Sequence, residues 1–440
     1  MPSESTRKKW RSRALVCALL GVLSSDASAQ LRIQITAGVE RPIPIAVVPF
    51  AWQGSGSAPF DVTSVIAADL ATSGRFAPLP ESDLVSRPSQ PAQVNFATWR
   101  SLETDVLLIG QISPDAAAGY SIVFQLFDVP RGEQLLAFRV TSAANDLRAT
   151  AHRIADMIFE EITGVPGVFS TRIAYINELR NANTRMFRLI VADYDGENAR
   201  VIAESPQPLM SPAWSPDGRR LAYVSFEGNQ AAIYIQTLRT GTRDLASRRA
   251  GVNGAPVFSP DGRRLALTLS QDGNLDLYTL EIGAQVLRRI TDSPAIDTEP
   301  AWSSDGRFLY FTSDRAGGPQ IYRIEAVPNA RPERMTFEGE YNTRPRVSPD
   351  GKQLAIVHRD RGQDRIAVLD LDTRFLQVLS NGRLDESPSF APNGAMIIYA
   401  TRDAGQGVLS AVSSDGRVKQ RIAAVAGDVR EPLWSPFALP

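Results

Sequence analysis

One repeat constrains the fold of this 440-residue chain more than any other feature. Its copies are anchored by prolines at positions 212, 256, 300, 345, 388 and 432, which lie 44, 44, 45, 43 and 44 residues apart. Four copies, at 211–218, 255–262, 299–306 and 344–351, end in Ser-Pro-Asp-Gly or Ser-Ser-Asp-Gly. A fifth copy (387–394) is degenerate, and a sixth (431–436) contains only the first part of the motif. A period of this length is typical of solenoids and propellers, in which each repeat is one supersecondary unit.

Each copy predicts a tight turn between two strands. Ser-Pro-Asp-Gly favours a type I turn, because proline fixes φ at the second position and glycine takes the left-handed conformation at the fourth. Apolar strands follow the turns at 221–224, 265–267 and 308–311, and third strands follow at 232–235, 276–279 and 320–323. A more polar fourth strand completes each unit. Four strands in roughly 40–45 residues is the spacing of a propeller blade.

The strand count predicts how the ring closes. The segment 172–176 has the pattern of a second strand but has no first strand before it, whereas the last repeat, at Pro432, supplies only a first strand. Placing this C-terminal strand in the blade that begins at Arg172 gives six blades and leaves no open seam. Seven blades or an open solenoid are the alternatives, and both would leave strand edges unpaired.

The residues before the repeat alternate strand and helix patterns, which predicts a small α/β domain. Polar and apolar side chains alternate over 31–36, and 45–50 is a continuous apolar run, so both segments are predicted strands. Helices are expected from Asp61 or Thr63 to Gly74, over 95–102 and from Asn145 to Gly164, with further strands at 106–109, 121–129 and 133–141. The expected organisation is an α/β domain over 30–164, a linker over 165–170 and, over 171–440, a six-bladed β-propeller closed by the C-terminal strand.

The first residues predict a secretory signal peptide over 1–29. Five basic residues between Arg7 and Arg13 precede an apolar run over 14–23, and Ala27-Ser28-Ala29 then supplies small residues for cleavage between Ala29 and Gln30. The apolar run is too short to span a bilayer, although an uncleaved anchor is the alternative. The only cysteine, Cys17, lies in this segment, so the exported protein is expected to fold without disulfides.

Charge and composition argue against several function classes. The 47 Lys+Arg nearly cancel the 48 Asp+Glu, which gives no reason to expect binding to nucleic acid or to anionic membranes. The chain has two histidines, His152 and His358, and contains neither a G-x-S-x-G elbow nor a P-loop, so no enzyme, metal or cofactor is expected. His152 is expected to be an ordinary helical residue that is solvated or partly buried. The repeated Asp-Gly pairs are expected to be turn residues rather than paired catalytic carboxylates.

Motifs outside the repeat resemble one known family. They are RPIPIAVVPF at 41–50, TRIAY at 171–175, SPQPLMSPAW at 205–214, NGAP at 253–256 and TEP at 298–300. Together with the signal peptide and the six repeats, they resemble the TolB family of the periplasmic Tol-Pal system over the whole exported chain. Prolyl-oligopeptidase-type propellers carry a similar repeat, but they need an added hydrolase domain that this chain lacks.

The resemblance implies a monomeric, non-catalytic periplasmic protein that connects two partners. These are TolA, an inner-membrane protein, and Pal, the peptidoglycan-associated lipoprotein of the outer membrane. The implied role is in outer-membrane integrity and in constriction at cell division. The alternative is a periplasmic propeller hydrolase or a small-ligand-binding protein that uses the central channel.

The resemblance also implies where the partners bind. The C-terminal domain of TolA would take up the first exported residues by adding them to a sheet edge: Gln30, Leu31, Arg32, Ile33, Gln34, Ile35 and Thr36. Pal would cover the mouth of the propeller channel and contact loops before the first strands of the blades, at Asn253, Ala255, Thr298, Glu299, Thr343, Arg344, Glu386 and Glu431. Bound Pal is expected to change how the N-terminal strand docks.

Simpler interpretations exist for both sets of residues. The segment 30–36 would then be the ordinary first strand of the α/β domain, and the loop residues would only shape the entry to each strand. Glu299 would be extended merely because it precedes Pro300. Val252 stands where a family member is expected to carry histidine, which argues against a polar contact at this position and leaves a hydrophobic contact open.

Overall fold

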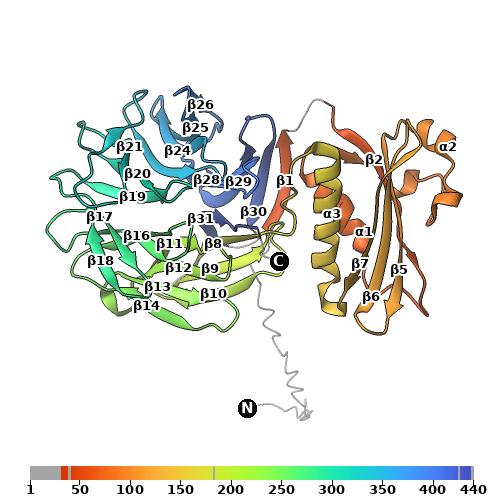
Figure 1. Ribbon diagram of the computed structural model, residues 1–440, viewed down its shortest axis with the longest axis horizontal. Coiled ribbons are helices and arrows are strands. Elements are labelled where there is room, and N and C mark those ends of the chain that lie inside the picture. The colour runs from red at the N-terminus through yellow and green to blue at the C-terminus, as the bar shows by residue number, and fades with distance from the viewer. Residues whose placement is uncertain (1–30, 38–40, 182–183, 425–426, 438–440) are drawn as a thin grey trace, which may run out of the picture.

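The computed structural model describes residues 31–37, 41–181, 184–424 and 427–437, which form an α/β domain beside a propeller (Figure 1). The predicted signal peptide over 1–29, its cleavage site and Gln30 lie outside these residues. In the described part of the chain, no helix is long and apolar enough to cross a membrane. The predicted fold class is confirmed, with six blades in the propeller.

The N-terminal domain is built on one mixed sheet with strand order β4-β2-β5-β6-β7, and a short β3 lies beside β5. β2 runs parallel to β4 and β5, whereas β5, β6 and β7 form an antiparallel meander. The apolar run that predicted a buried strand supplies β2, in which Ile45 and Ala46 are fully buried. The strand bounds are β2 (Ile43–Val47), β3 (Ala51–Trp52), β4 (Phe76–Pro78), β5 (Val106–Asp115), β6 (Gly119–Asp128) and β7 (Glu133–Ser142).

Helices cover both faces of this sheet. α1 (Val62–Thr72) and α3 (Leu147–Thr163) pack together between the sheet and the propeller (Figure 1). On the opposite face, α2 (Phe96–Arg100) packs Trp99 into the second core of the domain. The short 3-10 turns are η1 (Glu81–Asp83), η2 (Pro91–Gln93), η3 (Ala144–Asp146) and η4 (Glu227–Asn229).

Local sequence signals set most of these helix ends. Asp61 caps α1 by accepting a hydrogen bond from the Ser64 N–H at 3.1 Å, and Gly164 ends α3 in the left-handed conformation with φ of 71°. α3 begins at Leu147, slightly after the predicted start at Asn145, because η3 occupies the preceding residues.

Each propeller blade is a four-stranded antiparallel sheet, which we number 1 to 6 in chain order. Blade 1 contains β8 (Arg172–Arg180), β9 (Arg185–Asp193), β10 (Arg200–Ser205) and β31 (Asp428–Trp434). Blade 2 contains β11 (Leu209–Trp214), β12 (Arg220–Ser225), β13 (Ala232–Thr237) and β14 (Arg243–Ser247). Blade 3 contains β15 (Asn253–Phe258), β16 (Arg264–Leu269), β17 (Asp276–Glu281) and β18 (Val286–Arg289).

The remaining three blades repeat this pattern. Blade 4 contains β19 (Asp297–Trp302), β20 (Phe308–Ser313), β21 (Gln320–Glu325) and β22 (Glu333–Arg334). Blade 5 contains β23 (Asn342–Val347), β24 (Gln353–Asp360), β25 (Gln363–Asp370) and β26 (Leu376–Val378). Blade 6 contains β27 (Glu386–Phe390), β28 (Met396–Asp403), β29 (Gln406–Ser413) and β30 (Lys419–Ala424). The C-terminal β31 pairs antiparallel with β8, so the ring closes as the strand count predicted.

The Ser-Pro-Asp-Gly segments form the predicted turns. In blade 3, the Gly262 N–H donates to the Ser259 carbonyl at 2.8 Å, and Gly262 has φ of 69°. The Asp261 carboxylate accepts from the Ser259 hydroxyl at 2.5 Å and from the Arg263 N–H at 3.1 Å. These aspartates are therefore used within their own turns, as the sequence indicated.

An arginine ladder that the sequence reasoning missed connects blades 1 to 4. Arg172, Arg220 and Arg264 each donate to a turn-glycine carbonyl of the next blade, at 3.1, 3.4 and 3.3 Å. Each guanidinium also lies over an aromatic ring of that next blade, at 5.4, 5.3 and 4.5 Å from the ring centroid. The ladder stops at blade 4, where Phe308 occupies the arginine position.

The first described strand, β1 (Leu31–Ala37), does not join the α/β sheet. It pairs antiparallel with β30, from Leu31 opposite Ala424 to Ala37 opposite Lys419. Blade 6 thereby becomes a five-stranded sheet of order β1-β30-β29-β28-β27. The simpler interpretation of 31–36 as the first strand of the α/β sheet is therefore wrong, because its backbone hydrogen bonds go to the propeller.

Candidate functional site

Six residues that precede the blade prolines share an unusual backbone conformation. We call them the channel ring: Ser211, Ala255, Glu299, Arg344, Ser387 and Glu431, with φ of 51, 46, 55, 54, 55 and 50°. Positive φ is uncommon for residues other than glycine and costs about 1–2 kcal/mol. At each of these positions the pairing of the inner strand with its neighbour shifts register, which is the signature of a β-bulge. The extended conformation considered for Glu299 is wrong, because the bulge turns the backbone at this residue.

The channel ring lines a cavity of about 70 Å³ on the propeller axis. Five of the six blade prolines (all except Pro345), Arg346 and Leu433 complete its wall. Glu299 and Glu431 meet Arg344 and Arg346 in this space, and Glu386 lies 3.9 Å from Arg344. Three carboxylates against two guanidinium groups leave the site with a charge of −1 if all five are ionised.

Contacts between blades use most of these polar groups. The Glu299 carboxylate of blade 4 accepts from the Arg344 backbone N–H of blade 5 at 3.1 Å and pairs with the Arg344 Nε at 3.0 Å. Thr312 donates to the same carboxylate at 2.9 Å. Across the ring closure, the Glu431 carboxylate of blade 1 accepts from the Ser211 N–H of blade 2. The charged groups of the ring therefore hold neighbouring blades together.

Burial shifts the acidity of the ring. Burial raises the pKa of Glu431 despite the nearby Arg344 and the Ser211 N–H, and burial lowers the pKa of Arg346. For Arg344, burial acts to lower the pKa, but Glu299, Glu431 and Glu386 outweigh it, so its pKa is raised. Arg344 is thus held as a cation by carboxylates from three blades.

Polar residues at the start of the inner strands fix the loops that precede the ring. The Asn253 side chain accepts from Ser247 at 2.7 Å and from the Arg249 N–H at 2.9 Å, and it donates to the Arg249 carbonyl at 2.8 Å. Asp297, Asn342 and Asp385 occupy the equivalent place, three residues before the blade proline, and all four are almost fully buried. Asn253 was predicted to contact a partner, but its side chain is buried and its hydrogen bonds are used inside its own loop. The sequence reasoning missed its three equivalents, although the fixed spacing from the proline could have found them.

Three exposed apolar residues, one on each of blades 3, 4 and 6, lie at the same end of the propeller. Val252, Ile296 and Leu384, each four residues before a blade proline, are 45%, 44% and 41% exposed. The Val252 N–H donates to the Ser270 hydroxyl at 2.8 Å, and the Ile296 N–H donates to the Asp314 carboxylate at 2.8 Å. We call these three residues the rim. Rigid loops therefore present apolar side chains to solvent, an arrangement typical of a protein-binding surface.

Only some of the residues predicted to contact Pal lie together around the channel cavity. Ala255, Glu299, Arg344 and Glu431 line the cavity, Glu386 lies beside it, and Thr298 and Thr343 flank the ring within their strands. Val252, which the sequence reasoning treated as a departure from the family, is among the most accessible apolar residues of this end.

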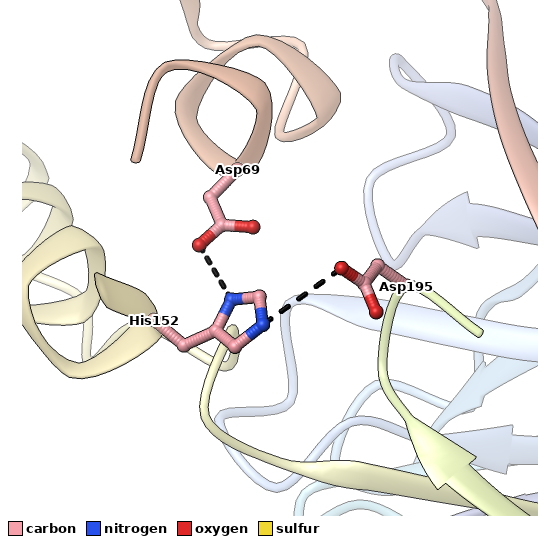
Figure 2. Close-up of side chains that lie close together, drawn as sticks. All are labelled: Asp69, His152 and Asp195. Atoms are coloured by element: carbon pink, nitrogen blue, oxygen red, sulfur yellow. Dashed lines mark hydrogen bonds and ion pairs between the residues drawn. The ribbon is translucent and has the colours of Figure 1, made fainter. Parts of the chain in front are cut away.

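A second polar cluster lies between the two domains. Among the described residues, Asp69, His152 and Asp195 form a group whose potential metal-ligand atoms all lie within 4.8 Å of one another (Figure 2). His152 was expected to be solvated or partly buried, but it is only 2% exposed, because α1 and the β9–β10 turn cover it. His358, in β24, is also buried and bonds the Asn342 side chain at 2.8 Å.

Two family models match most of the chain. The model described as the TolB beta propeller domain matches residues 159–438. The model described as the TolB amino-terminal domain matches residues 31–135.

Known proteins are similar over nearly the full length. Tol-Pal system protein TolB of Xanthomonas euvesicatoria pv. vesicatoria (strain 85-10) is 50% identical over 435 residues, covering 98% of this chain and 99% of the relative. The protein of the same name from Xanthomonas axonopodis pv. citri (strain 306) gives the same values. The crystal structure of TolB from Acinetobacter baumannii superposes with a TM-score of 0.85 at 38% identity, covering 92% of this chain and 100% of that one.

Proposed function

The chain belongs to the TolB family of Tol-Pal system proteins, and from this membership we propose that it is a periplasmic adaptor that links TolA to Pal. We assign Pal to the rim and the channel ring, and TolA to the N-terminal strand. The adaptor acts as a monomer and carries no catalytic step. Its role is in outer-membrane integrity and in constriction at division.

One observation carries this proposal: blade 6 contains elements of both candidate sites. Its inner strand β27 begins at Glu386, two residues after the rim residue Leu384, and carries Ser387 of the channel ring. Its outer edge is β1, the segment assigned to TolA. Three strands, β28, β29 and β30, separate the two sites within one continuous sheet. A partner on the rim can therefore act on β1 through a single hydrogen-bonded element.

The edge position of β1 supports its capture by a partner. Among the described strands, β1 pairs with β30 alone, and this antiparallel pairing shifts register between Ile35 and Ala37. An edge strand held through one ladder can exchange that ladder for the sheet edge of another protein. Pal bound at the rim would then bias the docked or released state of β1, which makes the two binding events reciprocally coupled.

The channel is less suited to a hydrolase or a small-ligand site. Its acidic groups are bonded to the neighbouring blades, as Glu299 is to Arg344 and Thr312. The turn aspartates, such as Asp261, are bonded within their own turns at the far end of the inner strands. Neither set leaves a free acid and base facing each other, which hydrolysis by paired carboxylates requires.

The rim gives a direct test of the Pal assignment. We expect Ile296→Asp and Val252→Asp each to weaken Pal binding by at least about tenfold, because a carboxylate then replaces an apolar side chain on the surface assigned to Pal. Calorimetry of the exported protein with the soluble domain of Pal measures this effect.

The matched control is Phe375→Asp. Phe375 is 64% exposed but lies in the β25–β26 loop, at the opposite end of the blade from the rim. The Phe375→Asp substitution should leave Pal binding unchanged. Circular dichroism should show the same fold for Ile296→Asp, Val252→Asp and Phe375→Asp. Undiminished binding by Ile296→Asp, or an equal loss with Phe375→Asp, would remove Pal from the rim.

A further inference from the structure

An ion network crosses the boundary between the two domains, with Asp69 and His152 buried and Asp195 and Arg148 partly exposed. His152 projects from α3 between Asp69 of α1 and Asp195 of the β9–β10 turn in blade 1 (Figure 2). Its Nδ1 lies 2.7 Å from Asp69 Oδ2, while its Nε2 lies 3.8 Å from Asp195 Oδ2. Tyr194, also in the turn, donates to Asp69 Oδ1 at 2.9 Å. Three segments distant in sequence therefore meet at one imidazole.

The positions of the two carboxylates favour a protonated His152 imidazole. The Asp69 carboxylate accepts a hydrogen bond from His152 Nδ1, so this nitrogen carries a proton. If His152 were neutral, Nε2 would then have no proton, and its lone pair would face the Asp195 carboxylate. Nε2 is buried and has no hydrogen-bond partner at its present distance. A lone pair facing a carboxylate in a buried site is repulsive, whereas an N–H⁺ in that place is attractive.

The charges of the network lead to the same conclusion. Burial raises the pKa of Asp69, although the hydrogen bond and charge of His152 and the hydrogen bond from Tyr194 oppose the rise. When both carboxylates are ionised, Asp69 and Asp195 contribute two negative charges, and Arg148, which pairs with Asp195, contributes one positive charge. With a second proton on His152 the four groups sum to zero, and without it they carry −1. Burial makes the neutral sum the more stable one.

We propose that this network is a proton-dependent latch: a proton on His152 Nε2 binds Asp195 and holds the α/β domain against the propeller, and its loss weakens that contact. The latch is distinct from both partner sites and concerns the domain arrangement on which they depend. A continuous apolar core also joins the domains, from Ile158 of α3 through Phe169 to Ile173 and Trp434 of blade 1. Loss of the proton therefore loosens the docking rather than separating the domains.

The groups around His152 set the pH range. Burial acts to lower the pKa of His152, but the hydrogen bond and charge of Asp69 and the charge of Asp195 outweigh burial and Arg148, so its pKa is raised. A histidine whose pKa is raised in the folded state contributes stability that is complete below its ordinary pKa of about 6.5. That contribution is lost as the pH rises through the raised pKa. The latch is therefore closed in acid and open in base.

Two other titratable groups near the network, Asp156 and Tyr194, change protonation outside the pH range of the latch. Asp156 lies one turn further along α3, where its carboxylate accepts from the Phe169 and Ser170 N–H groups at 2.7 and 3.0 Å and anchors the linker. Burial raises its pKa to about 6, so it titrates below the range of the latch. Burial and Asp69 raise the pKa of Tyr194 well above its ordinary value, so Tyr194 remains a donor.

Proton NMR tests the proposal directly, because the chain contains two histidines. His358→Gln assigns the two imidazole C–H resonances. We expect His152 to titrate above about 6.5 and His358 below that value, since burial lowers the pKa of His358. Asp195→Asn should lower the His152 pKa by about one unit, and the matched control Asp372→Asn, an exposed loop residue of blade 5, should not.

A distance measurement tests the mechanical part in the same protein. With Cys17→Ser the chain has no cysteine, so spin labels on Ser82→Cys and Thr240→Cys report one interdomain distance. We expect a narrow distribution at about pH 6.5 and a broader one at about pH 9, with the Asp195→Asn variant broad at both.

Three results would overturn the latch. The first is a His152 pKa at or below that of His358 in the unmodified protein. The second is a distance distribution that is the same at both pH values. The third is a shift of the His152 resonance by one equivalent of Zn²⁺ at about pH 9, reversed by a chelator, because the cluster would then be a metal site.

Discussion

A chain that ends at Gly427 is expected to lose the cooperatively folded propeller, because it lacks β31. This strand supplies the inner edge of blade 1, where it pairs with β8. Arg430 on β31 also pairs with the buried Glu178 of β8 at 2.7 Å. Trp434 donates to Thr171 at 2.8 Å and packs into the core shared by the two domains. Together these losses exceed the roughly 5–15 kcal/mol by which domains are stable.

Thermal unfolding followed by circular dichroism measures this effect. The truncated protein should show no cooperative transition, and its exposed β8 edge should make it aggregate. A chain that ends at Phe437 is the matched control, because it keeps every residue of β31 and should unfold like the full chain. If the chain ending at Gly427 unfolded cooperatively near the transition of the full chain, β31 would not be what closes the ring.

Removal of residues 30–36 from the exported protein is expected to abolish TolA binding and to leave Pal binding intact. The segment contains most of β1, whose backbone hydrogen bonds go to β30 alone among the described strands. A partner that captures this segment gains its affinity from the main-chain ladder, so without the segment there is nothing to add to the partner's sheet. The rim and the channel ring belong to other strands and remain in place.

The control for this deletion keeps the length of the N-terminus. A scrambled segment that begins with Gln30 and contains the same seven residues without alternation of polar and apolar side chains should also lose TolA. Calorimetry with each partner separates the outcomes. TolA binding that survives the deletion would refute the assignment of 30–36, and loss of both partners would show that the deletion damages the fold.

The sequence predicts the architecture well where the signal is local and repeated. Each blade proline marks the same bulge, so the period of about 44 residues converts directly into a blade count. The turns are similarly predictable, because Ser259, Asp261 and Gly262 make their contacts within six residues. Capping residues such as Asp61 and Gly164 set helix ends for the same reason.

Long-range pairings account for what the sequence reasoning missed. The alternation over 31–36 indicates a strand but cannot show that Leu31 pairs with Ala424, because any exposed edge of suitable register would satisfy the same pattern. The sequence around His152 does not indicate its burial, since its partners Asp69 and Asp195 come from two other elements.

The candidate site shows the same limit within a single loop. The identity of Glu299 is visible in the sequence, but its left-handed conformation is imposed by the register shift of the sheet. Asn253 is likewise a polar residue of the kind that often contacts a partner. Only the structure shows that its side chain is buried and holds the loop in which Val252 is exposed. The exposed rim residues lie four residues before a blade proline, whereas the buried polar residues that hold these loops lie three residues before it.

Coupling between the two sites is the central claim, and one calorimetric comparison tests it most directly. The C-terminal domain of TolA is titrated into the exported protein alone and into the same protein saturated with Pal. If blade 6 transmits Pal binding from Leu384 and Glu386 to β1, the two affinities for TolA should differ by at least about fivefold. Equal affinities in the two titrations would contradict the account.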